Sequence, residues 1–416
     1  ERPKRLAKTI DAYHQEACNG IPPMTLGLQP LRAKLAILKA MNTPVHYHLN
    51  GFPPEALEWD RLIPLIGPAS AAIARYDGLL SAIPNAAVLL SPLTTQEAVL
   101  SSRIEGTVAT MGEVLEVEAG GEPDGMTDPK RGDVEEILNY RKAMRSLVGE
   151  LDHRSLSQQL LRQAHALLMT GVRGQEKNPG QYRSEQNWIG PRGCQIEEAG
   201  YVPISVEHLQ AGMDRWEVFL ADRSQQDQLV QLAMLHLEFE ALHPFMDGNG
   251  RLGRMLIPLF LFERRLLASP DFYMSDYLEA HREDYVARLR EVSASGDWTG
   301  WCCFFLEGLR RQATENESKA RAILALYERV KQQVVELTHS QHALRAVDFL
   351  FQTPIFKSPD FLSGSEIPKP TATRILRLLR KGEGALLRVA REGRGRMPGI
   401  YVFSELLNVS EGRDVF

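Results

Sequence analysis

The segment from His243 to Arg254 brings together, within twelve positions, the residue types that nucleotide chemistry needs. It reads His-Pro-Phe-Met-Asp-Gly-Asn-Gly-Arg-Leu-Gly-Arg, which supplies a base, a carboxylate, a glycine-rich turn and two arginines. A histidine has a reference pKa of about 6.5, which suits a general base near neutral pH. Asp247 offers a hard oxygen ligand of the kind that Mg²⁺ prefers. The segment therefore predicts a cradle for a polyphosphate and its metal ion, with a base beside it.

The glycines and arginines of this segment are spaced to hold an anion. Gly248 and Gly250 allow successive backbone N–H groups to turn toward one cluster of oxygens. Arg251 and Arg254 are three residues apart, so on a helix they share one face, where their planar forks can bind phosphate oxygens.

Apolar residues on either side predict two helices that position the segment. The upstream stripe consists of Leu229, Leu232, Leu235, Phe239 and Leu242. The downstream stripe consists of Leu252, Leu256, Leu259 and Phe260. The second helix is expected over Arg251–Leu267, bent by Pro258. The glycines then lie at a helix N-terminus, where unpaired N–H groups favour an anion.

Two other interpretations use the same residues. Gly248–Gly253 spells the dinucleotide fingerprint G-x-G-x-x-G, with Asp271 downstream as a ribose ligand, but that fingerprint must follow a strand. His236, Glu240 and His243 have the helical spacing of an iron site with two histidines and one carboxylate. We interpret His236 instead as a core residue. A turn without function would explain the glycines, but not the base, the carboxylate and two arginines together.

The segment matches in full the signature of the Fic (filamentation induced by cAMP) family, H-P-F-x-D-G-N-G-R-x-x-R. Residues 171–190 resemble the approach to the flap of this family, and Ile196–Ser205 resembles the flap hairpin itself. The resemblance covers most of the chain from about Gly67 onward. It implies a mainly α fold, in which a helical Fic core carries a small β-hairpin flap and is followed by a C-terminal winged-helix-like domain.

The activity that the resemblance implies is transfer of AMP from ATP to a Ser, Thr or Tyr hydroxyl of a target protein, which includes self-modification. His243 would deprotonate the hydroxyl, and Asp247 would bind Mg²⁺ or Mn²⁺. The anion hole and the phosphate clamp would be formed by Gly248, Asn249, Gly250, Arg251 and Arg254.

Two further pairs of residues are expected around the nucleotide. Tyr201 and Val202 belong to the flap, which would clamp the target segment by strand addition. Tyr277 and Tyr285 occupy positions where the family often contacts the nucleotide, although aromatic residues at this spacing are also typical of a core.

An upstream motif resembles the inhibitory signature S/T-x-x-x-E-G/N of many Fic proteins. It spans Ser101–Gly106, within a stretch predicted to be one helix over Thr94–Glu118. In such proteins the glutamate pairs with the second arginine of the signature and blocks the γ-phosphate site. Here Glu105 would pair with Arg254. Ser101 lies four residues before Glu105, so the two would share one helical face, and Gly106 completes the motif. A solvated glutamate before a glycine is the alternative interpretation.

Composition shifts divide the chain into five regions. They are an N-terminal Fic-associated region (1–90), an inhibitory-helix region (91–118), the catalytic core (119–313), a connecting helix (314–340) and the winged-helix-like domain (341–416). In the last region, Ala343–Phe351 and Pro370–Arg380 are predicted to be helices. Residues 386–389 and 400–403 are predicted to be two strands around a basic loop. This locally basic domain is expected to contact either DNA or another protein.

Overall composition limits the remaining choices. The 416 residues carry a formal net charge of −5, which argues against a protein that coats nucleic acid along its whole surface. No run of apolar residues is long enough to span a membrane. Four cysteines lack zinc-type spacing and a paired pattern, which predicts reduced thiols in the cytoplasm.

Two questions stay open from the sequence alone. Two alternatives to adenylyl transfer remain. The protein could be a DNA-binding regulator whose Fic core senses a nucleotide, or the same site could remove AMP from a modified protein. The resemblance also leads us to expect a homodimer.

Overall fold

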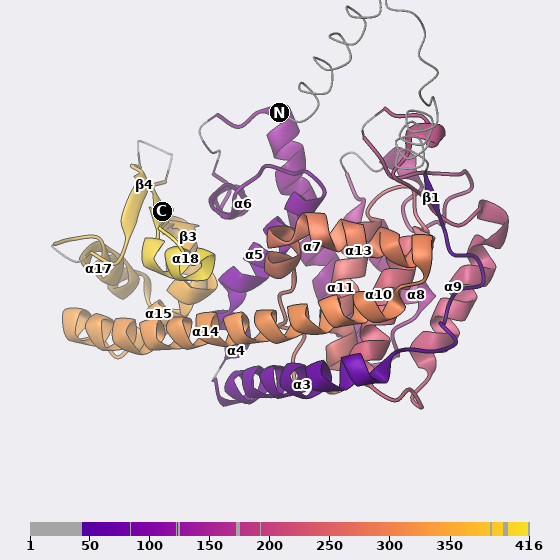
Figure 1. Cartoon of the computed structure of the whole chain (residues 1–416). Coiled ribbons are helices and arrows are strands. Elements are labelled where there is room, and N and C mark those ends of the chain that lie inside the picture. The colour runs from indigo at the N-terminus through magenta and orange to yellow at the C-terminus, as the bar shows by residue number, and fades with distance from the viewer. Residues whose placement is uncertain are drawn as a thin grey trace, which may run out of the picture. The chain divides into compact units, whose positions relative to one another are not determined.

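The computed structural model describes residues 44–83, 85–121, 123, 125–171, 175–191, 193–382, 385–393 and 398–414. Expectations for residues 1–43, 172–174 and 394–397 therefore lie outside the described residues. The chain forms two compact units: residues 1–44 with 190–200, and residues 45–189 with 201–416. In the first unit, Ile196–Glu198 form a short 3₁₀ helix, η2. The second unit is mainly α-helical (Figure 1).

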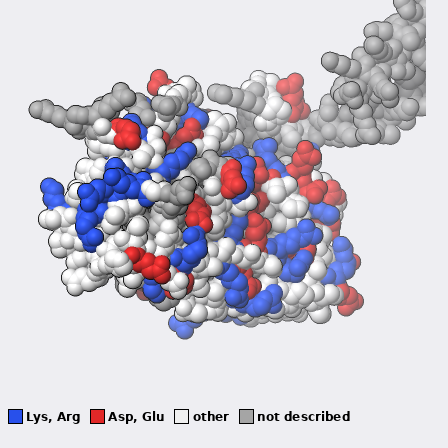
Figure 2. Space-filling model, turned by 90° about the vertical axis from the view of Figure 1, so that its left-hand side faces the viewer, with Lys and Arg blue, Asp and Glu red and all other residues white. Residues whose placement is uncertain are grey.

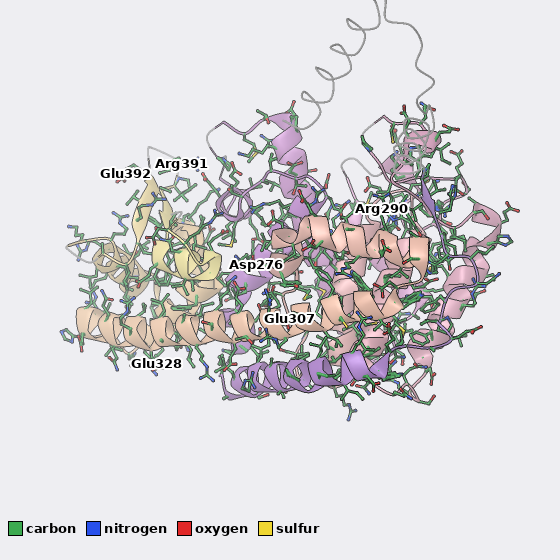
Figure 3. All side chains as sticks on the ribbon, in the orientation of Figure 1. Asp276, Arg290, Glu307, Glu328, Arg391 and Glu392 are labelled. Carbon is green, nitrogen blue, oxygen red and sulfur yellow. The ribbon has the colours of Figure 1, made fainter. Side chains whose placement is uncertain are left out.

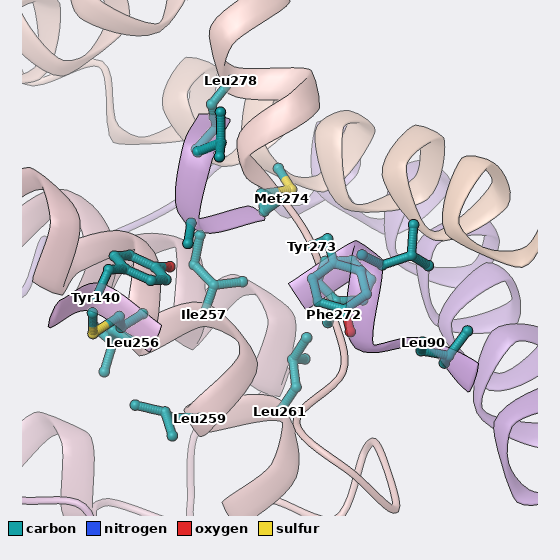
Figure 4. Close-up of a cluster of buried hydrophobic side chains, with 14 of the residues drawn as sticks. Leu90, Tyr140, Leu256, Ile257, Leu259, Leu261, Phe272, Tyr273, Met274 and Leu278 are labelled. Atoms are coloured by element: carbon teal, nitrogen blue, oxygen red, sulfur yellow. The ribbon is translucent and has the colours of Figure 1, made fainter. Parts of the chain in front are cut away.

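The predicted pair of helices around the glycine-rich segment is confirmed. α10 (Gln228–Leu242) is buried along almost its whole length, and α11 (Asn249–Glu263) contains Pro258. α11 ends four residues before the expected Leu267. Its apolar side chains pack in a cluster with Tyr140 and Phe272 (Figure 4). Burial of this kind stabilises by roughly 25 cal/mol per Å² of apolar surface, so the loop between the two helices has firm supports.

One long helix, α14 (Trp298–Thr338), runs from this core to the C-terminal elements (Figure 1). α3 (Trp59–Ala82) lies along it and includes Pro64 and Pro68. The expected boundary between residues 313 and 314 falls inside α14. The Trp301 indole N–H donates to the carbonyl of Ala233, 2.7 Å away, and fixes α14 to α10.

The single helix predicted over Thr94–Glu118 is wrong. The structure has α5 (Ser91–Ile104) and α6 (Met111–Glu118), separated by a turn in which Gly106 has a φ of +101°. Thr110 starts α6 with a capping box: its hydroxyl accepts from the Glu113 N–H, and the Glu113 carboxylate accepts from the Thr110 N–H. This local bonding outweighs the continuous apolar stripe. Glu105 consequently caps the C-terminus of α5.

The remaining helices that precede α14 complete this part of the fold. They are α4 (Ala86–Leu89), α7 (Asp128–Leu151), α8 (Gln158–Leu168), η1 (Gln175–Lys177), α9 (Val206–Ala221), α12 (Ser275–Ala280) and α13 (Arg282–Ser295). A two-stranded parallel sheet joins β1 (Val45–His46) to β2 (Tyr201–Val202). The hairpin expected over Ile196–Ser205 is wrong in extent, because antiparallel pairing is limited to Ile189 with Tyr201 in the described residues.

The C-terminal segment confirms both predicted helices and both predicted strands, with small shifts. Its elements are α15 (Ala343–Gln352), β3 (Ile355–Lys357), α16 (Ser358–Gly364), α17 (Lys369–Leu379), β4 (Arg388–Arg391), β5 (Ile400–Val402) and α18 (Ser404–Glu411). The antiparallel sheet has the order β3-β5-β4. Neither β3, α16 nor α18 was predicted. The order of elements agrees with a winged helix, and that name stays a prediction.

The C-terminal segment also contacts the upstream part of the chain. Both α15 and α18 pack against α5, the helix that ends at Glu105. No helix among the described residues combines the length and apolar character needed to cross a membrane.

Candidate active site

The loop between α10 and α11 is tight because two residues adopt a left-handed backbone. His243 ends α10 with a φ of 47°, and Gly248 precedes α11 with a φ of 77°. A side chain on Gly248 would be strained by this φ and would also lie 3.1 Å from the Met169 sulfur. Six other non-glycine residues among those described share a positive φ, and His339 ends α14 in the same way, so the conformation of His243 is that of a helix end.

Asn249 closes this loop through its side chain. Its amide Nδ2 donates to the Phe245 carbonyl, and its Oδ1 accepts from the Phe245 N–H, both at 2.8 Å. Asn187 donates to the same carbonyl at 3.0 Å. The Asn249 side chain is therefore committed to the loop, and only its backbone is left to line an anion hole.

His165, which the sequence analysis missed, packs against the loop and donates a hydrogen bond to its backbone. The His165 ring stacks on Phe245 with a centroid distance of 3.9 Å. Nδ1 of His165 accepts from the Gly180 N–H at 2.8 Å, so Nε2 carries the hydrogen and donates to the Asp247 carbonyl at 3.1 Å. Burial lowers the pKa of His165 to about 4, which keeps the ring neutral in this tautomer at neutral pH.

Arg183, also missed, neutralises the C-terminal end of α10. Its side chain is buried, and Nε donates to the carbonyl of His243 at 3.0 Å. Nη2 lies 3.5 Å from the Leu242 carbonyl and also bonds to that of Ile204. A cation at a helix C-terminus satisfies carbonyls that have no partner within the helix. Neither contact has a local sequence signal, because Arg183 lies 60 positions from His243.

His243 has the character of a base that is already neutral. Burial lowers its pKa to about 4, although the charge of Glu105 opposes this shift. Its Nδ1 lies 3.4 Å from the Glu240 carbonyl, which can only accept, so a hydrogen on Nδ1 is favoured. Nε2 is then the nitrogen that can accept a proton.

Glu105 and Arg254 form the contact that the inhibitory signature predicts. The Arg254 guanidinium is 1% exposed, and its Nη2 donates to Glu105 Oε1 at 2.6 Å. Its Nε donates to the Ser101 hydroxyl at 2.9 Å, and Nη2 also donates to the Ser101 carbonyl at 2.8 Å. Burial alone would raise the pKa of Glu105, but the positive charge of Arg254 outweighs it and holds that pKa below its usual value.

The Glu105 carboxylate also lies against the first turn of α11. A Cβ atom on Gly250 would be 2.1 Å from Glu105 Oε1 and 2.9 Å from Arg254 Nη1. The carboxylate therefore lies at the N-terminus of α11, where backbone N–H groups favour an anion. Its side chain is 40% exposed. The chemistry of these residues is compatible with the phosphates of a nucleoside triphosphate.

Asp247 and Arg251 lie on the other side of the same turn. Arg251 Nη2 lies 3.4 Å from Asp247 Oδ1, and Nη1 donates to Glu136 on α7 at 3.1 Å. The Asp247 side chain is 48% exposed, which leaves it accessible to a cation. Among the described residues no group of three or more His, Cys, Asp or Glu is placed to hold a metal ion. A Mg²⁺ at Asp247 would therefore take its other ligands from phosphate oxygens and water.

Glu240 is a second carboxylate at this site. Its Oε1 is buried without a hydrogen-bond partner in the described part of the chain. A Cβ atom on Gly253 would lie 2.2 Å from that oxygen. Burial raises the pKa of Glu240 to about 7, opposed by Arg254 and reinforced by Glu105. Sequence reasoning considered Glu240 only as a metal ligand.

The iron-site and dinucleotide interpretations are both excluded by the contacts. His236 Nδ1 donates to the Gly253 carbonyl, and its Nε2 accepts from the Tyr285 hydroxyl, both at 2.9 Å. Both ring nitrogens are thus committed within the core. The segment Gly248–Gly253 follows α10 rather than a strand, so the fingerprint lacks its required context.

The four residues expected around the nucleotide are buried in packing contacts. Tyr201 donates from its hydroxyl to the Ala241 carbonyl at 3.1 Å, and Val202 pairs with β1. Tyr285 is bonded to His236, and Tyr277 stacks on His281 with a centroid distance of 4.2 Å. The Tyr285 hydroxyl also interacts with Arg254 of the signature segment. The nucleotide roles of all four residues stay predictions.

Comparison with known proteins places this site in a family. Residues 63–147 match the Fic/DOC family N-terminal model, and residues 155–261 match the Fic/DOC family model. A Fido domain-containing protein of Dictyostelium discoideum is 30% identical over 112 residues, which are 27% of this chain and 69% of that protein.

A second relative and a solved structure were also compared. A probable protein adenylyltransferase of Aquifex aeolicus is 38% identical over 66 residues, which are 16% of this chain and only 18% of that protein. The crystal structure of a Fic family protein from Desulfovibrio desulfuricans has the same fold, with a TM-score of 0.54 at 21% identity. It covers 84% of this chain and 98% of that chain. The chain belongs to the Fic/DOC family.

Proposed function

We propose that this protein transfers AMP from ATP to a hydroxyl group of a protein, and that Glu105 holds the activity in check. The single observation that carries the proposal is the 2.6 Å contact of Glu105 with Arg254, at the turn that follows a neutral His243. A base and an anion site lie side by side at one loop, and Glu105 reaches that anion site from the end of α5. The name of the Aquifex aeolicus relative, a probable protein adenylyltransferase, agrees with the proposed reaction.

The reaction assigns a separate task to each part of the loop. His243 Nε2 takes the proton of the attacking hydroxyl while that oxygen bonds to the α-phosphorus. The bond from the α-phosphorus to the bridging oxygen breaks, and pyrophosphate leaves. Arg251, Arg254 and the backbone N–H groups at the start of α11 hold the phosphate charge, which is the main catalytic need in such transfers. Asp247 would hold a Mg²⁺, which would supply further charge neutralisation.

The inhibition that we propose is direct competition for Arg254. While its guanidinium is bonded to Glu105 and Ser101, it is not available to the terminal phosphate of ATP. The carboxylate also repels phosphate at the place beside Gly250. Removal of the Glu105 side chain would free both.

The test is incorporation of label from α-labelled ATP with Mg²⁺ into protein, with the wild type and the Glu105→Gly, Glu105→Gln and His243→Ala variants. We expect little label on the wild type, strong label on Glu105→Gly and none on Glu105→Gly combined with His243→Ala. Glu105→Gln keeps the size but loses the charge, so its label should be intermediate.

The two parts of the proposal fail differently. If the wild type and Glu105→Gly incorporate label equally, adenylyl transfer stands and inhibition by Glu105 falls. If label arrives only from γ-labelled ATP, or if no variant is labelled, adenylyl transfer itself falls.

Removal of AMP from a modified protein is the second candidate, and one observation favours it. The Glu105 carboxylate is ionised at neutral pH and is held in place by Arg254 beside the phosphate position. An ionised carboxylate so placed can orient a water for attack on a phosphodiester. Release of AMP from a labelled protein by the wild type, but not by Glu105→Gly, would support this reaction.

A further inference from the structure

The C-terminal segment carries a group of cations on one side of α17. Its apolar side is buried through Ala372, Ile375, Leu376 and Leu379. The opposite side exposes Lys369 and Arg377, with Lys381 just beyond the helix. These three residues are here called the α17 cationic face. Figure 2 views the molecule from the end at which α17 lies in Figure 1, and Lys and Arg side chains gather there.

This face is charged out of proportion to the rest of the chain. Residues 366–397 contain nine Lys and Arg but three Asp and Glu, whereas the whole chain has a net charge of −5. Arg377 lies in the last turn of α17 and Lys381 just beyond it, so two of the cations stand at the same end of the helix.

Several exposed cations of α14, unlike those of the α17 cationic face, form ion pairs with acidic residues. Arg311 and Arg321 pair with Glu307 and Glu317 at 2.6 and 2.7 Å, and Lys331 pairs with Glu328 at 3.2 Å. Glu307 and Glu328 lie along α14 in Figure 3. By contrast, among the described residues no Asp or Glu forms an ion pair with any residue of the α17 cationic face.

The backbone around α17 has the form of a helix-turn-helix. α16 and α17 pack together and are joined by the four residues 365–368. A connection of three or four residues is typical of this motif, whose second helix enters the major groove of DNA. α17 is 11 residues long, about 16 Å at 1.5 Å per residue. The major groove is about 12 Å wide and admits such a helix.

Two arginines of the α17 region anchor this helix to α14 and β5. The Arg374 guanidinium donates to the Thr338 carbonyl at the end of α14, 2.9 Å away. The Arg380 guanidinium lies over the Tyr401 ring of β5, 4.8 Å from its centroid. These two arginines anchor the helix, while the α17 cationic face stays exposed to solvent.

We propose that the α17 cationic face binds double-stranded DNA, with α17 in the major groove and Lys369 and Lys381 on backbone phosphates. The exposed cations, which form no ion pair with a described acidic residue, favour a polyanion, and the helix-turn-helix geometry favours a regular one over an acidic peptide. The proposal goes beyond adenylyl transfer and depends on none of its residues.

The test measures binding of the full chain to a fluorescent duplex of mixed sequence, by anisotropy at salt concentrations between about 50 and 200 mM. The variant Lys369→Ala/Arg377→Ala/Lys381→Ala removes three cations of the face. The matched control, Arg311→Ala/Arg321→Ala/Lys331→Ala, removes three cations that are paired on α14. Thermal unfolding of both variants shows whether either change affects the fold.

We expect binding of the wild type to weaken steeply with salt. Each lost phosphate contact lowers the slope of log affinity against log salt by about 0.9, so the face variant, which removes the proposed phosphate contacts of Lys369 and Lys381, should lose about 1.8 of that slope. The control variant and His243→Ala should bind as the wild type does.

Three results would overturn the proposal. They are absence of salt-dependent binding to the duplex, equal losses in the face and control variants, and tighter binding of the face to poly-glutamate than to the duplex. The last result would assign the face to an acidic protein.

Discussion

Glu105 takes up the space that a side chain at position 250 would need. A Cβ atom on Gly250 would lie 2.1 Å from Glu105 Oε1, closer than any real contact of a Cβ with an oxygen. Gly250 therefore makes room for the Glu105 carboxylate beside the first turn of α11. Under the proposed function, a phosphate oxygen of the nucleotide would compete with this carboxylate for the same place.

This relationship predicts that Gly250→Ala destabilises the protein only while Glu105 is present. Forcing the carboxylate away should lower the free energy of unfolding by about 1–3 kcal/mol, the usual cost of overpacking. In a Glu105→Gly background the same substitution should have a much smaller effect. A double-mutant cycle from denaturant unfolding measures the difference. Equal effects in both backgrounds would show that the contact does not contribute to stability.

Ser101→Ala should partly release the inhibition. The Ser101 hydroxyl accepts from Arg254 Nε at 2.9 Å, and a buried charged donor without its acceptor costs about 1–3 kcal/mol. Incorporation of AMP should then lie between that of the wild type and that of Glu105→Gly. Ser102→Ala is the matched control, because the buried Ser102 hydroxyl has no hydrogen-bond partner among the described residues. If both serine variants behave alike, the Ser101 bond has no part in inhibition.

Glu240→Gln should stabilise the protein at alkaline but not at acidic pH. The folded pKa of Glu240 is raised to about 7 from an ordinary value of 4.5, so the folded state holds its proton more tightly. Stability from this group is present below pH 4.5 and is lost as the pH rises to 7. The variant should exceed the wild type by about 1–3 kcal/mol at pH 8 and match it near pH 4.5. A constant difference between the two proteins at every pH would contradict this. Glu207→Gln, an exposed carboxylate on α9, serves as the control.

His165→Phe should make the protein less stable at neutral pH but less sensitive to acid. Phe keeps the stack on Phe245 and loses the bonds to Gly180 and Asp247, at a cost of about 1–3 kcal/mol. The folded pKa of His165 is lowered to about 4, so its stabilisation is present above pH 6.5 and is lost as the pH falls toward 4. In that window the variant should lose about 1.4 kcal/mol less per pH unit. Unfolding by denaturant at a series of pH values tests both parts.

As the pH is lowered, the rate of AMP transfer should begin to fall only well below the usual pKa range of histidine. His243 has a folded pKa of about 4, so it stays neutral as the pH falls through 6.5. The rate of Glu105→Gly should therefore begin to decline only toward pH 5 and below, since removal of Glu105 also removes a charge that raises this pKa. A decline centred near pH 6.5 would mean that His243 is not the titrating base.

The sequence predicted the parts of this site that are local in the chain. The two helices around the glycine turn follow from apolar spacing, and the pairing of Glu105 with Arg254 follows from two short motifs. Residues such as Arg183 and His165 could not be found in this way. They act on carbonyls 60 and 82 positions away, and nothing in their own neighbourhoods signals those partners.

The break between α5 and α6 was within reach of sequence reasoning. The sequence Thr110-Met-Gly-Glu113 has the form of a capping box, and Gly106 favours a left-handed turn. The apolar stripe through Met111 and Leu115 concealed both signals. In contrast, the hairpin expected over Ile196–Ser205 does not form as predicted, because β2 pairs with β1, more than 150 positions upstream. Such distant pairing leaves no local pattern in the sequence.

The position of α5 has a thermodynamic consequence. α5 contacts α11 on one side and the C-terminal helices α15 and α18 on another. A ligand that shifts these C-terminal helices against α5 therefore changes the free energy of the Glu105–Arg254 contact. Reciprocity then requires that a nucleotide which displaces Glu105 alters the affinity for that ligand by the same factor. Binding at the C-terminal helices and binding at the nucleotide site would thus be coupled through α5.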